Sequence, residues 1–257
     1  MRTIKERLAA GEIINTFAVG RFVDPVIVEM FALAGGYQAF WIDQEHVNSS
    51  SQDVYATALA GRANGLDSFV RMAPTGYSEV TQYLEIGVGG VMAAQINSAD
   101  HAREFTSWVK FPPSGTRGLN TGGYDADYTH LPPADFVEVA NQRNFVAIQI
   151  ETLGALNDAD EIAAIPDVDL LFVGPSDLSL QLGVCGQFHH EKLWEAIAKV
   201  AAACAAHGKH WGAVVPDPEF CDKAMELDCA MPTMGNGVVA VRRGIQALQT
   251  AFAKRFN

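Results

Sequence analysis

The sequence predicts an α/β fold, a (β/α)8 TIM barrel, and two observations lead to this prediction. Short, continuously apolar, β-rich segments alternate with helical patterns eight times along the chain, without a break in composition. The length of 257 residues is close to the ~250 residues of a typical barrel, and the hydrophobic content of 49% is enough for a large core. A doubly wound open sheet is the alternative, but it usually has fewer strands and a glycine-rich first turn. We therefore expect one TIM-barrel domain over residues 1–257.

The apolar segments define the expected strands, because continuous apolar runs of this length are typical of strands buried on both faces. The strands are expected at residues 16–22, 39–43, 68–72, 90–96, 145–151, 170–174, 212–216 and 230–234. Helical periodicity places helices at residues 25–34, 51–64, 78–86, 99–109, 134–142, 158–165, 193–207, 218–227 and 238–254. The first ten residues lack the apolar segment of a secretory leader and are expected to form an amphipathic helix.

The composition excludes several classes of partner. A net charge of −12 argues against nucleic acid or an anionic membrane surface. No apolar run reaches the ~18 residues that a membrane span requires. The four cysteines form no C-x-x-C pair and are expected to be buried thiols. We therefore expect a cytoplasmic protein that acts on small molecules, with neither nucleic acid nor membrane as a partner.

Two carboxylates follow successive strands of the expected barrel. Glu151 closes the apolar segment 145–151, and Asp177 follows the segment 170–174. A strand–helix–strand unit brings both strand ends to the same side of the sheet, where barrel active sites lie. Two carboxylates there are suited to Mg²⁺ or Mn²⁺, whereas Zn²⁺ prefers His and Cys. Either acid could instead cap the helix that follows it, but two such acids at successive strand ends favour a metal site.

Further polar residues occupy other expected strand ends. Arg71 ends an apolar strand, a position suited to bidentate carboxylate binding or to stabilising an oxyanion; a salt bridge to Asp43 or Glu45 is the alternative. His46 follows a buried strand and has both acids nearby, which favours a general base over a purely structural histidine. None of the seven lysines lies within or at the C-terminal end of an apolar strand, so a Schiff-base mechanism has no candidate residue.

Two connections also suggest function. The segment 111–133 is rich in Gly and Pro, and a loop of this length is usually functional; we expect it over the active-site face, with a surface excursion as the alternative. The turn from Gly174 to Asp177 leads into a helical pattern, and its backbone N–H groups are suited to hold a carboxylate or a phosphate.

Six short segments together resemble the metal-dependent (class II) pyruvate aldolases of the 4-hydroxy-2-oxoheptanedioate and 2-dehydro-3-deoxy-galactarate aldolase family. They are residues 41–46, 69–71, 84–87, 111–118, 149–151 and 174–179. The resemblance covers nearly the whole chain, and it implies a TIM barrel of the phosphoenolpyruvate/pyruvate superfamily, commonly assembled as a homohexamer. It also implies a carbon–carbon lyase that cleaves 4-hydroxy-2-oxo acids to pyruvate (or hydroxypyruvate) and an aldehyde through a metal-stabilised enolate.

The resemblance implies roles for individual residues. Glu151 and Asp177 would hold Mg²⁺, Mn²⁺ or Co²⁺, which the 2-oxo acid chelates, and Arg71 would steady the enolate oxygen. His46 would move the proton together with a water on the metal, and Gln149 would position that water. The remaining roles are a cradle for the substrate carboxylate around Gly174, Pro175, Ser176 and Asp177, and support of His46 by Asp43 and Glu45.

The chain departs from the family pattern at three places. The family usually has Asp where this chain has Glu85, an acid that pairs with the catalytic histidine across a subunit interface. Arg21 ends the first strand, where small or neutral residues are usual; it would bind a carboxylate of the acceptor or pair with an acid. The segment 232–239 differs from the usual Gly-Ser-Asp pattern.

Two alternative functions remain open at this stage. One is an acyl-CoA lyase of the malyl-CoA or citryl-CoA type, which is usually longer and carries basic residues for CoA phosphates; the net charge of −12 argues against it. The other is a non-catalytic 2-oxo-acid-binding barrel, in which Glu85 has cost the chain its activity.

Overall fold

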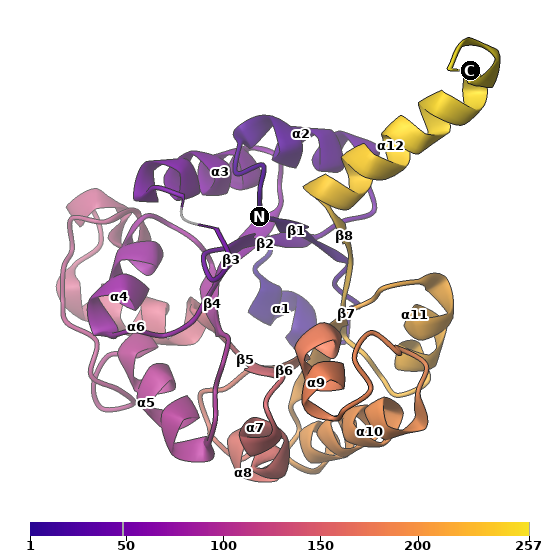
Figure 1. Cartoon of the computed structure of the whole chain (residues 1–257). Coiled ribbons are helices and arrows are strands. Elements are labelled where there is room, and N and C mark those ends of the chain that lie inside the picture. The colour runs from indigo at the N-terminus through magenta and orange to yellow at the C-terminus, as the bar shows by residue number, and fades with distance from the viewer. Residues whose placement is uncertain (48, 257) are drawn as a thin grey trace.

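The computed structural model describes residues 1–47 and 49–256, and its strands form a closed parallel barrel in chain order, as predicted (Figure 1). The strands are β1 (Thr16–Val19), β2 (Ala39–Asp43), β3 (Asp67–Met72), β4 (Gly90–Ala93), β5 (Phe145–Ile150), β6 (Leu170–Val173), β7 (His210–Val214) and β8 (Met231–Asn236). The predicted TIM barrel is therefore confirmed. β2 has the predicted bounds, whereas β1 and β4 each end three residues earlier than predicted.

Helices surround the barrel (Figure 1). They are α1 (Ile4–Ala9), α2 (Pro25–Ala34), α3 (Ser51–Ala63), α4 (Tyr77–Glu85), α5 (Ala99–Val109), the 3₁₀ helix η1 (Tyr124–Thr129), α6 (Pro133–Arg143), α7 (Leu153–Asn157), α8 (Ala159–Ala163), α9 (Pro175–Gln181), α10 (Glu191–Ala206), α11 (Pro218–Met225), α12 (Gly237–Ala251) and the 3₁₀ helix η2 (Ala253–Arg255). α2 and α5 have the predicted bounds. The helix expected at 158–165 is the shorter α8, and α7, which was not predicted, precedes it. No described helix is long and apolar enough to cross a membrane.

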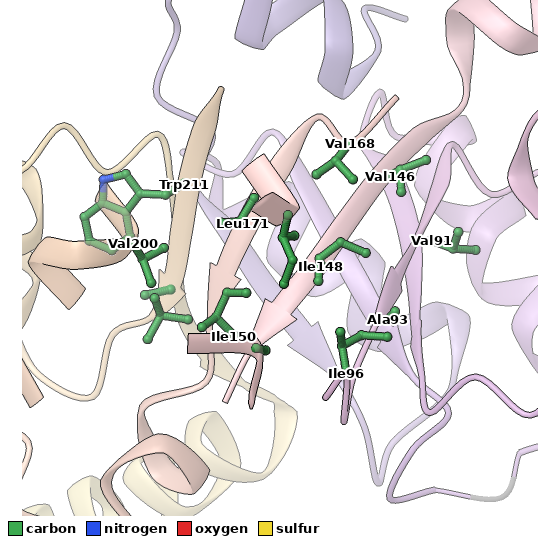
Figure 2. Close-up of a cluster of buried hydrophobic side chains, with 14 of the residues drawn as sticks. Val91, Ala93, Ile96, Val146, Ile148, Ile150, Val168, Leu171, Val200 and Trp211 are labelled. Carbon is green, nitrogen blue, oxygen red and sulfur yellow. The ribbon is translucent and has the colours of Figure 1, made fainter. Parts of the chain in front are cut away.

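Alternation along the strands divides the core into two layers. One set of strand residues packs outward against the helices, as Val146, Ile148 and Leu171 do (Figure 2). The residues between them, such as Phe69 and Phe172, pack inside the barrel. The polar residues near the strand ends continue this inner face: Arg71 is two residues beyond Phe69 on β3.

Helix α1 closes one end of the barrel. Ile4 and Leu8, together with Ile14, belong to the same apolar cluster as the inward-facing strand residues. The backbone N–H of Ile4 donates to Asp67 Oδ2 at the first residue of β3, at 2.8 Å. The N-terminal ends of the strands are therefore plugged, and the opposite end is left for a site.

The expectation that segment 111–133 covers the active-site face was wrong for this chain. The N–H of Gly118 donates to the Tyr77 hydroxyl at 2.7 Å, and the Arg62 guanidinium lies 3.9 Å from the centroid of the Tyr124 ring. The segment therefore runs along the helical layer beside α3 and α4. The reason is topological: the segment connects α5 to α6, whereas the mouth of a barrel is built from strand-to-helix loops.

Candidate active site

Arg71 is the centre of a buried ion-pair cluster at the C-terminal end of β3. Its Nη2 lies 2.8 Å from Asp43 Oδ2 and its Nε donates to Asp43 Oδ1 at 3.2 Å, while its Nη1 lies 3.1 Å from Glu45 Oε2. Strand register produces the first contact, because Asp43 of β2 is paired opposite Arg71. The guanidinium also lies over the Trp41 ring, 4.8 Å from its centroid. Both acids named in the salt-bridge alternative therefore fix the plane of Arg71.

The turn after β2 presents His46 at the barrel mouth. Asp43 Oδ1 accepts hydrogen bonds from the backbone N–H groups of Glu45 (3.0 Å) and His46 (3.2 Å), which fixes the turn. The His46 side chain is exposed, and its Nε2 lies 3.7 Å from Glu45 Oε2. Asp43 and Glu45 thus contact both Arg71 and the turn that carries His46.

Glu151 is almost completely buried just beyond β5, with 1% of its surface exposed. Its Oε1 accepts from the backbone N–H (2.8 Å) and from Nε2 (3.1 Å) of Gln95, and its Oε2 accepts from Gln149 Nε2. Burial raises the pKa of Glu151 to about 7; the Gln95 hydrogen bond opposes this rise, whereas the negative charges of Glu45 and Asp177 add to it. The cluster thus holds more negative charge than Arg71 balances.

Gln95 is a site residue that the sequence prediction missed. The expected strand 90–96 included it, whereas β4 ends at Ala93 and Gln95 has a φ of +55°. This left-handed conformation turns both its backbone N–H and its side chain towards Glu151. The available signal was its position two residues past an apolar strand, close to where Glu151 follows β5.

Gly174 lies directly against the Glu151 head group. A Cβ atom added at Gly174 would come within 2.6 Å of both Gln149 Nε2 and Glu151 Oε2. Its φ of −94° is open to any residue, so the requirement for glycine is one of space. Gly174 precedes α9, in whose first turn Asp177 lies half-buried.

Neither predicted metal-binding acid caps a helix. The N-cap of α7 is Thr152, whose side chain accepts from Ala155 N, and the N-cap of α9 is Gly174. Asp177 makes no side-chain hydrogen bond within residues 1–47 and 49–256. The capping alternative is therefore wrong for both acids. Among the described residues Asp177 has no side-chain partner, whereas both oxygens of Glu151 accept hydrogen bonds from Gln95 and Gln149.

The donor set fits a hard divalent cation. Gln149 Oε1 is buried beside Glu151 without a hydrogen-bond partner among the described residues. Over the same part of the chain, no group of three or more His, Cys, Asp or Glu side chains has the spacing of a metal site. Glu151 and Asp177 would supply two carboxylate ligands. The other coordination positions of the cation would be open to water and substrate, as is common at Mg²⁺ sites.

A cavity of about 310 Å³ opens at the mouth beside the Arg71 cluster. Its polar lining includes Arg21, Asp43, His46, Arg71 and Asn236. A second cavity, of about 530 Å³, lies beside it next to α11 and α12, and Trp41 and Asn236 line both. The segment 232–239, which departs from the family pattern, therefore forms a wall of the mouth.

The structure separates Glu85 from His46 within one chain. Glu85 ends α4 and accepts a hydrogen bond from Asn120 Nδ2 at 2.9 Å, in the layer outside the barrel. The other predicted site residues lie at the C-terminal ends of β2, β3, β5 and β6, and Arg21 lies just past β1.

Comparison with known proteins agrees with this geometry. The family description HpcH/HpaI aldolase/citrate lyase matches residues 24–228. The chain is 34% identical over 208 residues to the 4-hydroxy-4-methyl-2-oxoglutarate aldolase cghB of Chaetomium globosum, covering 80% of this chain and 77% of that protein. It is 28% identical over 226 residues to the hydroxypyruvate/pyruvate aldolase of Delftia acidovorans, covering 88% and 83%.

Among solved structures, an HpcH/HpaI aldolase/citrate lyase family protein from Burkholderia cenocepacia has a TM-score of 0.88 at 29% identity and covers 96% of this chain and 98% of its own. The predicted family resemblance is confirmed: this chain belongs to the HpcH/HpaI aldolase/citrate lyase family.

Proposed function

We propose that this carbon–carbon lyase reversibly cleaves 4-hydroxy-2-oxo acids to pyruvate, or hydroxypyruvate, and an aldehyde through an enolate, with Mg²⁺, Mn²⁺ or Co²⁺ as cofactor. One observation carries the proposal: the buried carboxylate of Glu151, with Asp177 nearby, lies beside a rigidly held arginine. Family membership and the aldolase names of the relatives support the reaction class.

The position of Lys110 argues against the Schiff-base route. Lys110 is fully buried, and burial lowers its pKa to about 8, as a nucleophilic lysine would need. Its Nζ donates to the backbone oxygens of Asn141 and Asn144, each at 2.9 Å, just before the first residue of β5. It therefore lies at the plugged end of the barrel, away from Glu151 and Arg71.

Arg71 is suited to stabilise an enolate oxygen. Glu151 and Asp177 would hold the divalent cation, which would supply a Lewis acid for the 2-oxo acid. Arg71 adds N–H donors in an orientation fixed by Asp43, Glu45 and the Trp41 ring. Preorganised donors of this kind stabilise developing negative charge without reorganising during the reaction.

His46 and Gln149 complete the proposed machinery. His46 lies at the open mouth, where it would exchange a proton with the substrate or with water. The unpartnered Oε1 of Gln149 would orient a water or substrate hydroxyl. The turn from Gly174 to Asp177, with Pro175 and Ser176, would contact the substrate carboxylate.

We also propose that the active form is a homo-oligomer, such as the hexamer that the resemblance implies, in which Glu85 of one subunit pairs with His46 of another. Two exposed apolar stripes support assembly. Val26, Met30 and Leu33 lie along α2, and Val241, Ile245 and Leu248 along α12, which projects away from the barrel (Figure 1).

The metal requirement gives the direct test. Release of pyruvate from 4-hydroxy-2-oxoheptanedioate and 4-hydroxy-2-oxoglutarate should cease after treatment with EDTA and return on addition of Mg²⁺ or Mn²⁺. Activity that is indifferent to the chelator would contradict the proposed mechanism. The non-catalytic alternative would be indicated if the protein binds pyruvate tightly but does not exchange its methyl protons in D₂O, whether Mg²⁺, Mn²⁺ or Co²⁺ is supplied.

A further inference from the structure

Arg21 is exposed at the barrel mouth, and its two neighbours in the chain lie against surrounding elements. It lies in the loop between β1 and α2 and lines the 310 Å³ cavity together with His46 and Arg71. The preceding residue, Gly20, lies against Asp43: a Cβ added there would be 4.0 Å from Asp43 Cβ. The following residue, Phe22, packs against Gly237 at the start of α12, where an added Cβ would lie 3.1 Å from the Phe22 ring.

The nearby acids already have partners. Both oxygens of Asp43 bind Arg71, and Oδ1 also accepts two backbone N–H groups. Glu45 contacts Arg71 and His46. Within the part of the chain that the structure describes, the guanidinium of Arg21 has no carboxylate oxygen within 4.0 Å. The pairing of Arg21 with an acid of its own chain, one of the two predicted roles, is therefore not seen.

The acidic residues around the mouth point to a role for Arg21 in binding a carboxylate. Asp43, Glu45, Glu151 and Asp177 make the mouth acidic, and Arg71 is engaged by two of them. The proposed divalent cation would offset Glu151 and Asp177 and would bind the 2-oxo acid, while Asp43 and Glu45 are the two acids that engage Arg71. Arg21 is therefore the arginine of the 310 Å³ cavity that is left for a carboxylate of the acceptor. A guanidinium binds a carboxylate through two parallel hydrogen bonds, whereas a neutral aldehyde offers it no anionic partner.

From these observations we propose that Arg21 selects the acceptor: it binds the carboxylate of an anionic carbonyl acceptor, either an aldehydo acid or a second 2-oxo acid. This inference rests on the proposed aldolase function and narrows its substrate class. The matching cleavage substrates carry a second carboxylate on the half of the molecule that leaves as the aldehyde or ketone.

Acceptor pairs that differ in the carboxylate test the proposal. Pyruvate is condensed with glyoxylate or acetaldehyde, and with succinic semialdehyde or butanal, while pyruvate self-condensation tests a 2-oxo acid as acceptor. For Arg21→Met, which keeps an unbranched stem but removes the guanidinium and its charge, we expect kcat/KM for carboxylated acceptors to fall about tenfold or more relative to neutral ones. Arg21→Lys should recover part of this preference. The acceptor whose kcat/KM falls most in Arg21→Met identifies the preferred class: a short aldehydo acid, a longer aldehydo acid or a 2-oxo acid.

Arg242→Met is the matched control. Arg242 lies on α12 and, with Phe22, lines a different cavity outside the mouth. Its loss should leave the ratio of carboxylated to neutral acceptors within about twofold of the unmodified protein. The inference is overturned if Arg21→Met leaves that ratio unchanged, or if both variants lower it equally. If the unmodified protein condenses pyruvate with none of these acceptors, the proposed function is instead refuted.

Discussion

The two ends of the barrel both bury a carboxylate, Asp67 at one end and Glu151 at the other, but the balance of charge around the two differs. At the plugged end, burial raises the pKa of Asp67, while two backbone N–H groups and the charges of Arg143 and Arg7 oppose the rise. At the open end, burial likewise raises the pKa of Glu151. There Glu45 and Asp177 add to the rise, while the Gln95 hydrogen bond and Arg71 oppose it. Burial alone therefore does not mark a functional acid; an excess of like charge around it does.

The largest effect is expected from Glu151→Gln at the open end. The change keeps the volume of the side chain but removes a carboxylate from the proposed cation site. We expect kcat/KM for pyruvate release to fall by about 10³-fold. The measurement is steady-state cleavage at saturating Mg²⁺, with circular dichroism as a check of folding. Near-normal turnover in the folded variant would break the contrast between the two ends.

Arg71→Ala should have the next largest effect on turnover. It removes the donors proposed for the enolate oxygen, and loss of one donor of this kind costs about 10²- to 10³-fold in kcat. Arg62→Ala is the matched control, since Arg62 stacks on Tyr124 and donates to the Gly87 carbonyl outside the barrel. Equal losses of kcat in both variants would indicate a structural role for Arg71.

The raised pKa of Glu151 predicts a pH dependence of stability. In the folded protein the pKa of Glu151, about 7, exceeds its ordinary value of 4.5. The stability that the protonated side chain contributes to the free energy of unfolding is therefore full below pH ~4.5 and is lost as pH rises through ~7. Without metal, this amounts to roughly 3 kcal/mol. Urea unfolding of the metal-free protein between pH 5 and 8 checks it: the difference in free energy of unfolding between Glu151→Gln and the unmodified chain should grow with pH. A constant difference would contradict the assignment.

Asp67→Ala gives the smallest expected effect and sharpens the contrast from the other end. It leaves the N–H groups of Ile4 and Ser68 without their acceptor, at a cost of about 2 kcal/mol in the free energy of unfolding. The cleavage rate per folded molecule should stay within about twofold of the original, because Asp67 lies at the end away from the mouth. A large loss of kcat with intact folding would show that the plugged end also serves catalysis.

The continuous apolar segments and the helical periodicity between them predicted much of this structure, because both patterns reflect local burial. They gave the barrel, the bounds of β2, α2 and α5, and the strand ends that carry Arg71 and Glu151. Contacts between distant segments were harder to predict. The backbone of Gln95 turns to φ +55° where the apolar pattern continued through it, so the donor to Glu151 was missed.

Two other features also depend on more than the local sequence. The course of segment 111–133 along the helical layer follows from its place between α5 and α6, and the composition of the segment does not encode that place. The proposed pairing of Glu85 with His46 would require a second copy of the chain, and periodicity within one chain carries no signal for such a contact.

The position of Trp41 gives the site an optical reporter. Its indole lies beneath the Arg71 guanidinium, donates to Thr233 Oγ1 at 3.2 Å, and borders both cavities at the mouth. Indole fluorescence responds to neighbouring charge and to water. Pyruvate or a carboxylated acceptor entering the mouth should therefore change the emission of Trp41, so that binding can be followed before any bond is made or broken.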